Sequence, residues 1–224
     1  MTSGVSTPHI YPEYCHDLSP SVKKWCPLQV VDVHRLDDRG MYSNGRRLYH
    51  HGNHPIKWVR LTGLVVAVDE FYGRRVFTLD DSSGSCIECT SPAPPKTIRP
   101  GLTNLATSVG AETKTNAENQ APNTRPSVSN PTVPWELVDV GAVVKVKGVI
   151  TIFREQKQVE MIKVDILRSI DQEVRCWNES LQFRREILET PWVVSQEQEE
   201  KCRRRARRGM ARERKAKKTT KGRS

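Results

Sequence analysis

Residues 56–71, IKWVRLTGLVVAVDEF, form an apolar-rich run that is interrupted once, by Gly63. Before this glycine, Val59 and Leu61 share one face of the predicted strand. After it, the apolar positions are shifted by one residue, to Leu64, Val66 and Val68. A glycine with such a shift is typical of a bulge, or of the sharp bend at the corner of a barrel. The run therefore predicts a long strand that bends in its middle.

Four more strands and a helix are predicted downstream. A long connection separates the third strand from the fourth, and Pro191 ends the helix. Five strands, a bent first strand and a C-terminal helix match the oligonucleotide/oligosaccharide-binding (OB) fold, a five-stranded Greek-key barrel. We predict an all-β core of this kind, with a short helical N-terminal extension. The later elements are strands at 74–81, 85–91, 140–155 and 158–169 and a helix at 171–189.

The composition divides the chain into segments. Residues 92–134 contain 8 of the 14 prolines and no Phe, Tyr or Trp. Such a stretch cannot bury enough apolar surface to offset its chain entropy, so we expect it to be a disordered insertion. We also expect disorder in residues 1–10, which show no secretory signal, and no run of 18 apolar residues predicts a membrane span. The predicted domain is 11–191, followed by a basic tail at 192–224.

Nearly all of the excess charge lies in that tail. The chain has a net charge of +10, and residues 201–224 contain 13 of the 36 basic residues but 1 of the 26 acidic ones. The other 200 residues, with 23 basic and 25 acidic side chains, carry −2. So dense a basic run indicates a nuclear-import signal or a sequence-independent phosphate clamp, unless it is solvated without a role. It can extend as a charged helix, and its candidate residues are Arg203, Arg204, Arg205, Arg207, Arg208, Lys215, Lys217 and Lys218.

Two patterns in the hairpin RRVFTLDDSSGSCIEC (74–89) resemble sites of chemistry. Asp80 and Asp81 are adjacent on a strand and point to opposite faces, so they do not converge on one substrate atom. Cys86 and Cys89 also face opposite ways, and no second CxxC follows. We interpret the carboxylates as turn residues and the thiols as buried and free.

No other pattern indicates an enzyme. GxGxxG, Walker A, HExxH and GxSxG motifs are all missing from the sequence. The histidines at 50, 51 and 54 have no regular ligand spacing, so we expect solvated loop residues. Six irregularly spaced cysteines favour a reducing nuclear or cytosolic setting. We predict no catalytic residue, no metal and no cofactor.

The helix at 171–189 has two apolar stripes. A helix packed on one domain needs a single apolar face, so we predict that the second stripe binds a partner. We favour Cys176, Phe183 and Ile187 for this role, with the Trp177 and Leu181 stripe as the alternative if the barrel takes the first. A further interpretation is that residues 11–39 cover the second stripe. The candidate partner-binding residues are Val174, Cys176, Trp177, Leu181, Phe183, Ile187 and Leu188.

The outward face of the predicted barrel offers cations and aromatic rings, which bind single-stranded nucleic acid by charge and by base stacking. The near-neutral body predicts weak intrinsic binding that assembly strengthens. Each lysine has an ordinary solvent-facing alternative, and Trp58 has the alternative of packing under the N-terminal extension. The candidates are Trp58, Arg60, Arg74, Arg75, Lys145, Lys147, Phe153 and Arg154.

Four stretches of the chain resemble the fungal Stn-one family, a subunit of the telomere-capping CST complex. The most specific blocks are NHPIKWVR and TLDDSSG-x-CIEC, and the barrel is also similar to the middle subunit of replication protein A. Longer family members carry winged-helix modules after the barrel, whereas this chain continues into a basic tail. The resemblance is found at 11–26, 53–71, 74–89 and 143–155.

The resemblance implies a nuclear protein at the telomeric region of the chromosome. Its implied partners are the small OB-fold protein Ten-one, docked through the C-terminal helix, the larger CST subunit, single-stranded telomeric DNA and DNA polymerase alpha–primase. Two other hypotheses stay open. One is an interaction scaffold of a complex like replication protein A, without DNA contact of its own, and the other is an RNA-related barrel with a basic arm.

Overall fold

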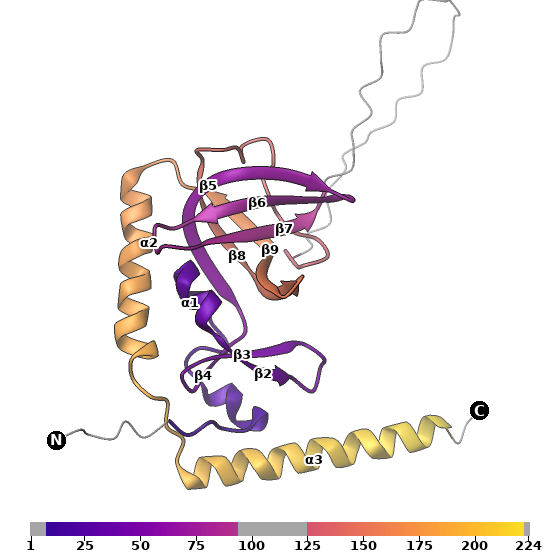
Figure 1. The fold of residues 1–224 in the computed structure, drawn as a ribbon. Coiled ribbons are helices and arrows are strands. Elements are labelled where there is room, and N and C mark those ends of the chain that lie inside the picture. Colours follow the sequence, from indigo (N-terminus) through magenta and orange to yellow (C-terminus); the bar gives the residue numbers. More distant parts are fainter. Residues whose placement is uncertain (1–7, 94–124, 222–224) are drawn as a thin grey trace, which may run out of the picture.

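A closed five-stranded barrel forms the centre of the molecule (Figure 1). The computed structural model describes residues 8–93 and 125–221. β5 pairs with both β6 and β8, and β7 pairs with β9 in parallel, which closes the sheet. The chain therefore adopts the predicted OB fold. The barrel strands are β5 (Val59–Phe71), β6 (Arg74–Asp80), β7 (Cys86–Pro92), β8 (Val143–Phe153) and β9 (Gln156–Ile166).

Two glycines let neighbouring strands approach closely. A Cβ atom at Gly63 would lie 2.3 Å from the carbonyl oxygen of Asp80 on β6. A Cβ atom at Gly148 would lie 2.4 Å from the carbonyl oxygen of Glu160 on β9. Both distances are far below van der Waals contact, so any side chain at these positions would push the strands apart.

The predicted shift of the buried face directly after Gly63 is wrong. Val65 is fully buried, whereas Leu64 and Val66 are exposed, so the inward alternation of Val59 and Leu61 continues past the glycine. The pairing register of β5 with β6 changes between Val65 and Ala67 instead. The extra residue of this bulge shifts the alternation by one position, so Val68 faces the core.

An N-terminal extension covers one end of the barrel. Its strand β1 (Cys26–Pro27) pairs with β5 in parallel, and β2, β3 and β4 form a separate antiparallel sheet below the barrel (Figure 1). This sheet is not foreseen by the sequence pattern, because all five residues of β2 are exposed. The other elements are η1 (Glu13–Leu18), α1 (Val30–Arg35), β2 (Asp37–Met41), β3 (Arg47–His51) and β4 (His54–Ile56).

The hairpin between β6 and β7 holds the first turn of α1. Asp81 accepts a hydrogen bond from the Val30 amide at 2.8 Å, and Ser83 Oγ accepts one from the Val31 amide at 3.1 Å. Asp80 instead accepts an amide within the turn, at 2.8 Å. The two carboxylates therefore serve different amides, as their opposite directions on the strand indicate.

Some expectations about burial were wrong. Cys89 is fully buried, but Cys86, on the opposite face of β7, is exposed. His50 and His54, expected in solvated loops, are buried because the sheet of β2, β3 and β4 packs against η1 and the chain after α2. His54 Nε2 lies 2.8 Å from the Thr190 carbonyl oxygen.

Acid should destabilise the protein through His50. Burial, and to a smaller extent the neighbouring His16 and Arg39, together lower the pKa of His50 to about 4. The unfolded chain, with a histidine pKa of about 6.5, then binds the proton more readily than the folded one. The stabilisation is complete above pH 6.5 and is lost as the pH falls toward 4, by about 3 kcal/mol in all. Urea unfolding at several pH values measures this loss, and His50→Gln should flatten the curve. An unchanged slope in this variant would contradict the assignment.

Helix α2 (Ile170–Phe183) runs along the barrel and continues into a π-helical turn, η2 (Arg184–Leu188) (Figure 1). The Glu189 amide donates to the Arg184 carbonyl oxygen five residues earlier, at 3.0 Å. This wider turn rotates Leu188 into the barrel core, where it is 7% exposed. At 100° per residue, an ideal α-helix would place Leu188 in the same stripe as Trp177 and Leu181, and the sequence alone therefore predicts the wrong face for Leu188.

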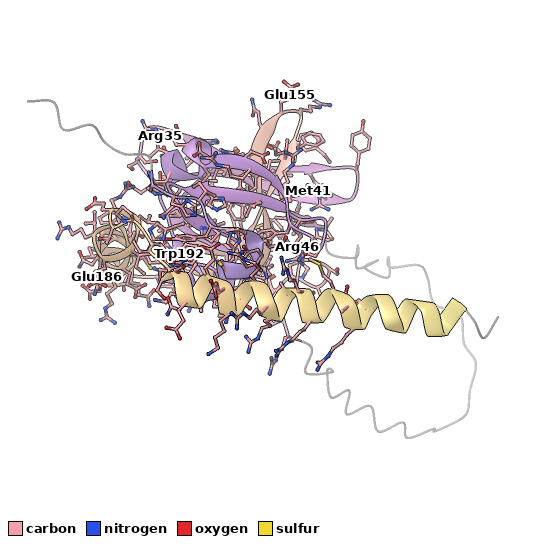
Figure 2. The ribbon with its side chains drawn as sticks, turned by 90° about the horizontal axis from the view of Figure 1, so that it is seen from below. Arg35, Met41, Arg46, Glu155, Glu186 and Trp192 are labelled. Atoms are coloured by element: carbon pink, nitrogen blue, oxygen red, sulfur yellow. The ribbon has the colours of Figure 1, made fainter. Side chains whose placement is uncertain are left out.

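The chain after α2 is fastened to the N-terminal extension before α3 (Gln196–Lys221) begins. The Asn53 side chain donates to the Trp192 carbonyl oxygen at 2.7 Å and accepts from the Trp192 amide at 3.0 Å. The Val194 amide donates to the Tyr11 hydroxyl at 2.9 Å. Figure 2 shows Trp192 beside the start of α3. Asn53 and His54, from the block NHPIKWVR, thus hold a segment about 140 residues away.

The predicted disordered insertion, residues 92–134, lies mostly outside the described residues. Its last part is described and is packed more closely than expected. The Thr132 amide donates to the Ile162 carbonyl oxygen at 2.9 Å, and Val133 packs against the core. Within the described part of the chain, no helix has the length and apolarity to cross a membrane.

Candidate functional site

The outward faces of β5, β8 and β9 bring cations from distant parts of the chain together. Arg60 on β5 lies opposite Lys147 on β8, and Lys147 lies opposite Lys163 on β9. Lys145 is paired with Thr62 on the same face. Antiparallel partners on one face lie within side-chain contact of each other. Four predicted residues therefore share this surface: Trp58, Arg60, Lys145 and Lys147.

Two tryptophans lie at the edge of this surface. The rings of Trp25 and Trp58 have centroids 5.3 Å apart and are both half-buried. The Arg46 guanidinium and the Lys57 ammonium each lie 5.4 Å from the Trp58 ring centroid, and Lys147 Nζ lies 6.0 Å from that of Trp25. These five residues are called the basic tryptophan cluster below. Aromatic faces flanked by cations suit nucleobases linked by phosphates.

Sequence reasoning missed Trp25 and Arg46. Trp25 reaches Trp58 because β1 pairs with β5, with Cys26 opposite Val59, and a two-residue parallel strand leaves no pattern in the sequence. Arg46 reaches the same ring from the turn between β2 and β3, a sheet that was not predicted. The neighbouring pair Lys57 and Trp58 was the available signal.

The cations of this face are crowded and only partly neutralised. Burial lowers the pKa of Lys147, and Lys145, Lys163 and Arg60 lower it further, against the opposing effect of Asp165. Asp165 forms ion pairs with Lys145 at 3.7 Å and with Lys163 at 3.0 Å. A polyanion bound here would relieve the repulsion among the cations, but it would compete with these ion pairs.

The other four predicted nucleic-acid-binding residues lie at two strand turns. Arg74 binds Thr90 Oγ1 and Glu160, each at 3.0 Å, and Arg75 lies 4.9 Å from the Trp135 ring centroid. Both guanidinium groups thus already have partners inside the molecule. Phe153 is exposed at the β8–β9 turn, with the guanidinium of Arg154 5.2 Å from its ring centroid. This aromatic ring is available to a ligand.

The structure reverses the preferred choice between the two stripes of α2. Cys176 and Phe183 are buried, and Phe183 belongs to the barrel core together with Leu188. Ile187 packs against the same core. These side chains are not available to a partner while the barrel is intact. The favoured stripe was wrong because the barrel itself needs that face, so the stated alternative stripe remains.

The remaining apolar positions of α2 form an exposed stripe, called the outer α2 stripe below. Trp177 is 49% exposed and Leu181 47%, and Ile170 and Val174 continue the same face. The N-terminal extension does not cover this stripe in the described part of the chain. An apolar helix face with a half-exposed tryptophan is typical of a protein interface.

A pocket of about 330 Å³ adjoins this stripe. Its lining includes Trp177 and Leu181 of α2, together with Pro27 and Leu28 of the N-terminal extension and Asp81 of the β6–β7 hairpin. Arg184 also lines the pocket and is held by an ion pair with Asp32 and a hydrogen bond to Gln29 at 3.1 Å. A pocket beside an exposed aromatic residue can receive an anchoring side chain of a partner.

The basic tail is helical, which is the charged helix that the sequence allowed. The first five candidate arginines of α3, at 203, 204, 205, 207 and 208, are all exposed. The side chains of Lys215, Lys217 and Lys218 lie outside the described residues. The Arg60–Glu179 ion pair, at 2.5 Å, links the basic face of the barrel to α2, so the two candidate surfaces are neighbours.

Comparison with known proteins gives one family. The family model described as telomere regulation protein Stn1 matches residues 7–93. The protein Stn1 of Schizosaccharomyces pombe is 31% identical over 65 residues, which are 29% of this chain and 19% of that protein. This chain therefore matches about a fifth of the length of its curated relative.

Two solved structures resemble the fold. A crystal structure of yeast Stn1 and Ten1 has a TM-score of 0.57 at 18% identity and covers 87% of this chain and 90% of the matched one. A crystal structure of the S. pombe Stn1–Ten1 complex has a TM-score of 0.49 at 19% identity, with 73% and 93% covered. The yeast match agrees with the OB fold derived from the strand pairing.

Proposed function

We propose that this chain, whose residues 7–93 match the family model for telomere regulation protein Stn1, belongs to that family and is an OB-fold subunit that caps chromosome ends. It forms a heterodimer with a small OB-fold protein of the Ten1 kind and holds single-stranded telomeric DNA. It acts in the nucleus, at the telomeric region, as a binding protein and not as an enzyme. Protection of the end, with coordination of lagging-strand fill-in by DNA polymerase alpha–primase, is the proposed outcome.

The outer α2 stripe carries this proposal. Trp177 and Leu181 are half exposed on α2, and both line the pocket beside this helix. The yeast structure with a similar fold contains Stn1 together with Ten1. Burial of two large apolar side chains that are now in water would favour association.

Single-stranded DNA is assigned to the basic tryptophan cluster and the cations beside it. Phe153 and Arg154 extend this surface at the β8–β9 turn, while Arg74 and Arg75 contribute charge at its far edge. Because Glu179 and Asp165 neutralise part of the charge, the barrel alone binds weakly, and the assembled complex binds more strongly. The larger CST subunit supplies further contacts in that assembly.

Replacing both tryptophans of the cluster should weaken single-strand binding. Stacking contributes about 1–3 kcal/mol per base, so Trp25→Ala with Trp58→Ala should lower the affinity of the heterodimer about 10- to 100-fold. A gel shift with a telomeric single strand, with and without the small partner, measures this. Trp177→Ala is the matched control and should leave DNA binding of the isolated chain unchanged. Full affinity in the double variant would remove the cluster from the proposal.

The second candidate function is an interaction scaffold that does not itself touch DNA. The ion pairs of Arg60 with Glu179 and of Lys145 with Asp165 favour it, because they occupy cations that DNA would need. In that case the heterodimer would assemble normally, and the wild-type gel shift would show no bound single strand.

A further inference from the structure

The start of α3 is fixed in position and is built to be helical. The Ser195 amide donates to Gln198 Oε1 at 3.1 Å, and the Gln198 amide donates to Ser195 Oγ at 3.3 Å, which is a reciprocal capping pair. Glu197 and Glu199 in the first turn complement the helix dipole. One turn later, Cys202 packs against the buried cluster of Tyr11, Cys15, Trp192 and Val194.

The described arginines of α3 lie on one side of the helix. At 3.6 residues per turn, they span an arc of about 200°. Much of the opposite side consists of small or uncharged residues, namely Cys202, Ala206 and Gly209. On this side, Cys202 contacts the body of the protein. Figure 2 shows α3 extending beyond the body with its side chains projecting outward. The arc consists of Arg203, Arg204, Arg205, Arg207, Arg208 and Arg212.

Most of this charge is not neutralised within the described part of the molecule. Arg203 pairs with Glu199 at 3.6 Å and Arg204 with Glu200 at 3.1 Å, both one turn apart on the helix. Arg205, Arg207, Arg208 and Arg212 have no ion pair among the described residues and are exposed. The helix therefore presents at least four free guanidinium groups to an anionic partner.

Helix geometry selects among the possible anions. A single strand is bound by stacking on aromatic rings as well as by charge, and residues 196–224 contain no aromatic residue. A flat acidic protein surface would contact a narrow stripe of the helix and leave much of a 200° arc unused. The major groove of duplex DNA, about 12 Å wide, admits a helix about 10–12 Å in diameter and has phosphates along both walls.

We propose that α3 binds double-stranded DNA by lying in the major groove, with its arginines on the phosphates of both strands. Of the alternatives given for the tail, this proposal takes the phosphate clamp, and it names the ligand as duplex DNA rather than the single strand held by the barrel. The contact is independent of base sequence, because it is made to the phosphates. The barrel and α3 thus take different forms of DNA.

Fluorescence anisotropy of the full chain tests whether the arginines of α3 bind duplex DNA. The probes are a blunt 20-base-pair duplex of mixed sequence and one of its strands alone. Arg205→Gln, Arg208→Gln and Arg212→Gln together should lower duplex affinity at least 10-fold. They should also reduce the slope of log affinity against log salt by about 2.7, at 0.9 per lost phosphate contact. Single-strand affinity should not change. The control, Arg35→Gln with Arg168→Gln and Arg185→Gln, removes the same charge from exposed positions elsewhere.

Gly209→Pro tests the helix. It keeps every charge but breaks α3 at its middle, so duplex affinity should fall, while a flexible polycation would bind as before. Unchanged duplex binding in the proline variant, or equal losses for duplex and single strand in the arginine variant, would overturn the proposal. If the wild-type chain bound the duplex but not the single strand, the function proposed for the barrel would be wrong. The proposal for α3 would still hold.

Discussion

Replacing Trp177 and Leu181 by glutamate should abolish heterodimer formation, with a loss of affinity of at least 100-fold. Truncation of an interface tryptophan typically costs about 2–4 kcal/mol, and a charge in a desolvated contact adds to that cost. Both side chains are about half exposed, so the barrel should fold normally. Co-purification with the small OB-fold partner, followed by titration calorimetry, measures the loss.

Matched controls separate this interface from general surface effects. Leu137 and Val140 are 47% and 60% exposed, lie before β8 and do not belong to the outer α2 stripe, so Leu137→Glu and Val140→Glu should leave the heterodimer intact. Phe183→Asp is unsuitable as an interface variant, because its side chain is part of the barrel core. Normal complex formation by the Trp177/Leu181 variant would mean that the partner binds to another surface.

Alanine at Gly63 or Gly148 should destabilise the barrel by about 3 kcal/mol, the upper end of the usual cost of overpacking. The added methyl group would lie 2.3 or 2.4 Å from a backbone carbonyl oxygen of the neighbouring strand, and neither the Asp80 nor the Glu160 backbone can move without loosening the sheet. Urea or thermal unfolding followed by near-ultraviolet circular dichroism measures the change.

Gly209 gives the opposite expectation for the same substitution. It lies in α3 with no atom within 4 Å of an added Cβ, so Gly209→Ala should not destabilise the barrel and should stabilise the helix by about 0.5–1 kcal/mol. If Gly63→Ala and Gly148→Ala proved as stable as Gly209→Ala, the close approach of the strands would not be what closes this barrel.

The barrel could be predicted because apolar and polar residues alternate within each strand. The number of strands, the bend in the first one and the helix after the last one then match the OB fold. Gly63 was correctly identified as a special position, but glycine is needed there because β6 approaches closely, and the bulge lies between Val65 and Ala67. The sheet of β2 to β4 could not be predicted, since Asp37–Met41 has no buried face. Its stability comes from contacts with η1 and with the chain after α2, which have no local signature.

The candidate surfaces could be predicted only where residues are brought together by local alternation along a strand. Trp58, Arg60 and Lys147 share a face by simple alternation, whereas Trp25 joins them through a parallel pairing that the sequence does not reveal. The π-helical turn at η2 changed the face of Leu188, because one wider turn shifts every later residue of a helix. Side-chain bonds from Asn53 to Trp192 join positions 139 apart, beyond any periodic pattern.

The bond between Tyr11 and Val194 joins residues 183 positions apart. During synthesis, the N-terminal half of this contact therefore leaves the ribosome long before the segment that completes it. Until then, the Tyr11 and Cys15 side chains have no Trp192 or Val194 to cover them, and the nascent chain exposes an apolar surface that the finished protein does not have. Docking of the C-terminal segment can then occur only late in folding. Before it docks, a chaperone could bind the exposed apolar surface near the N-terminus.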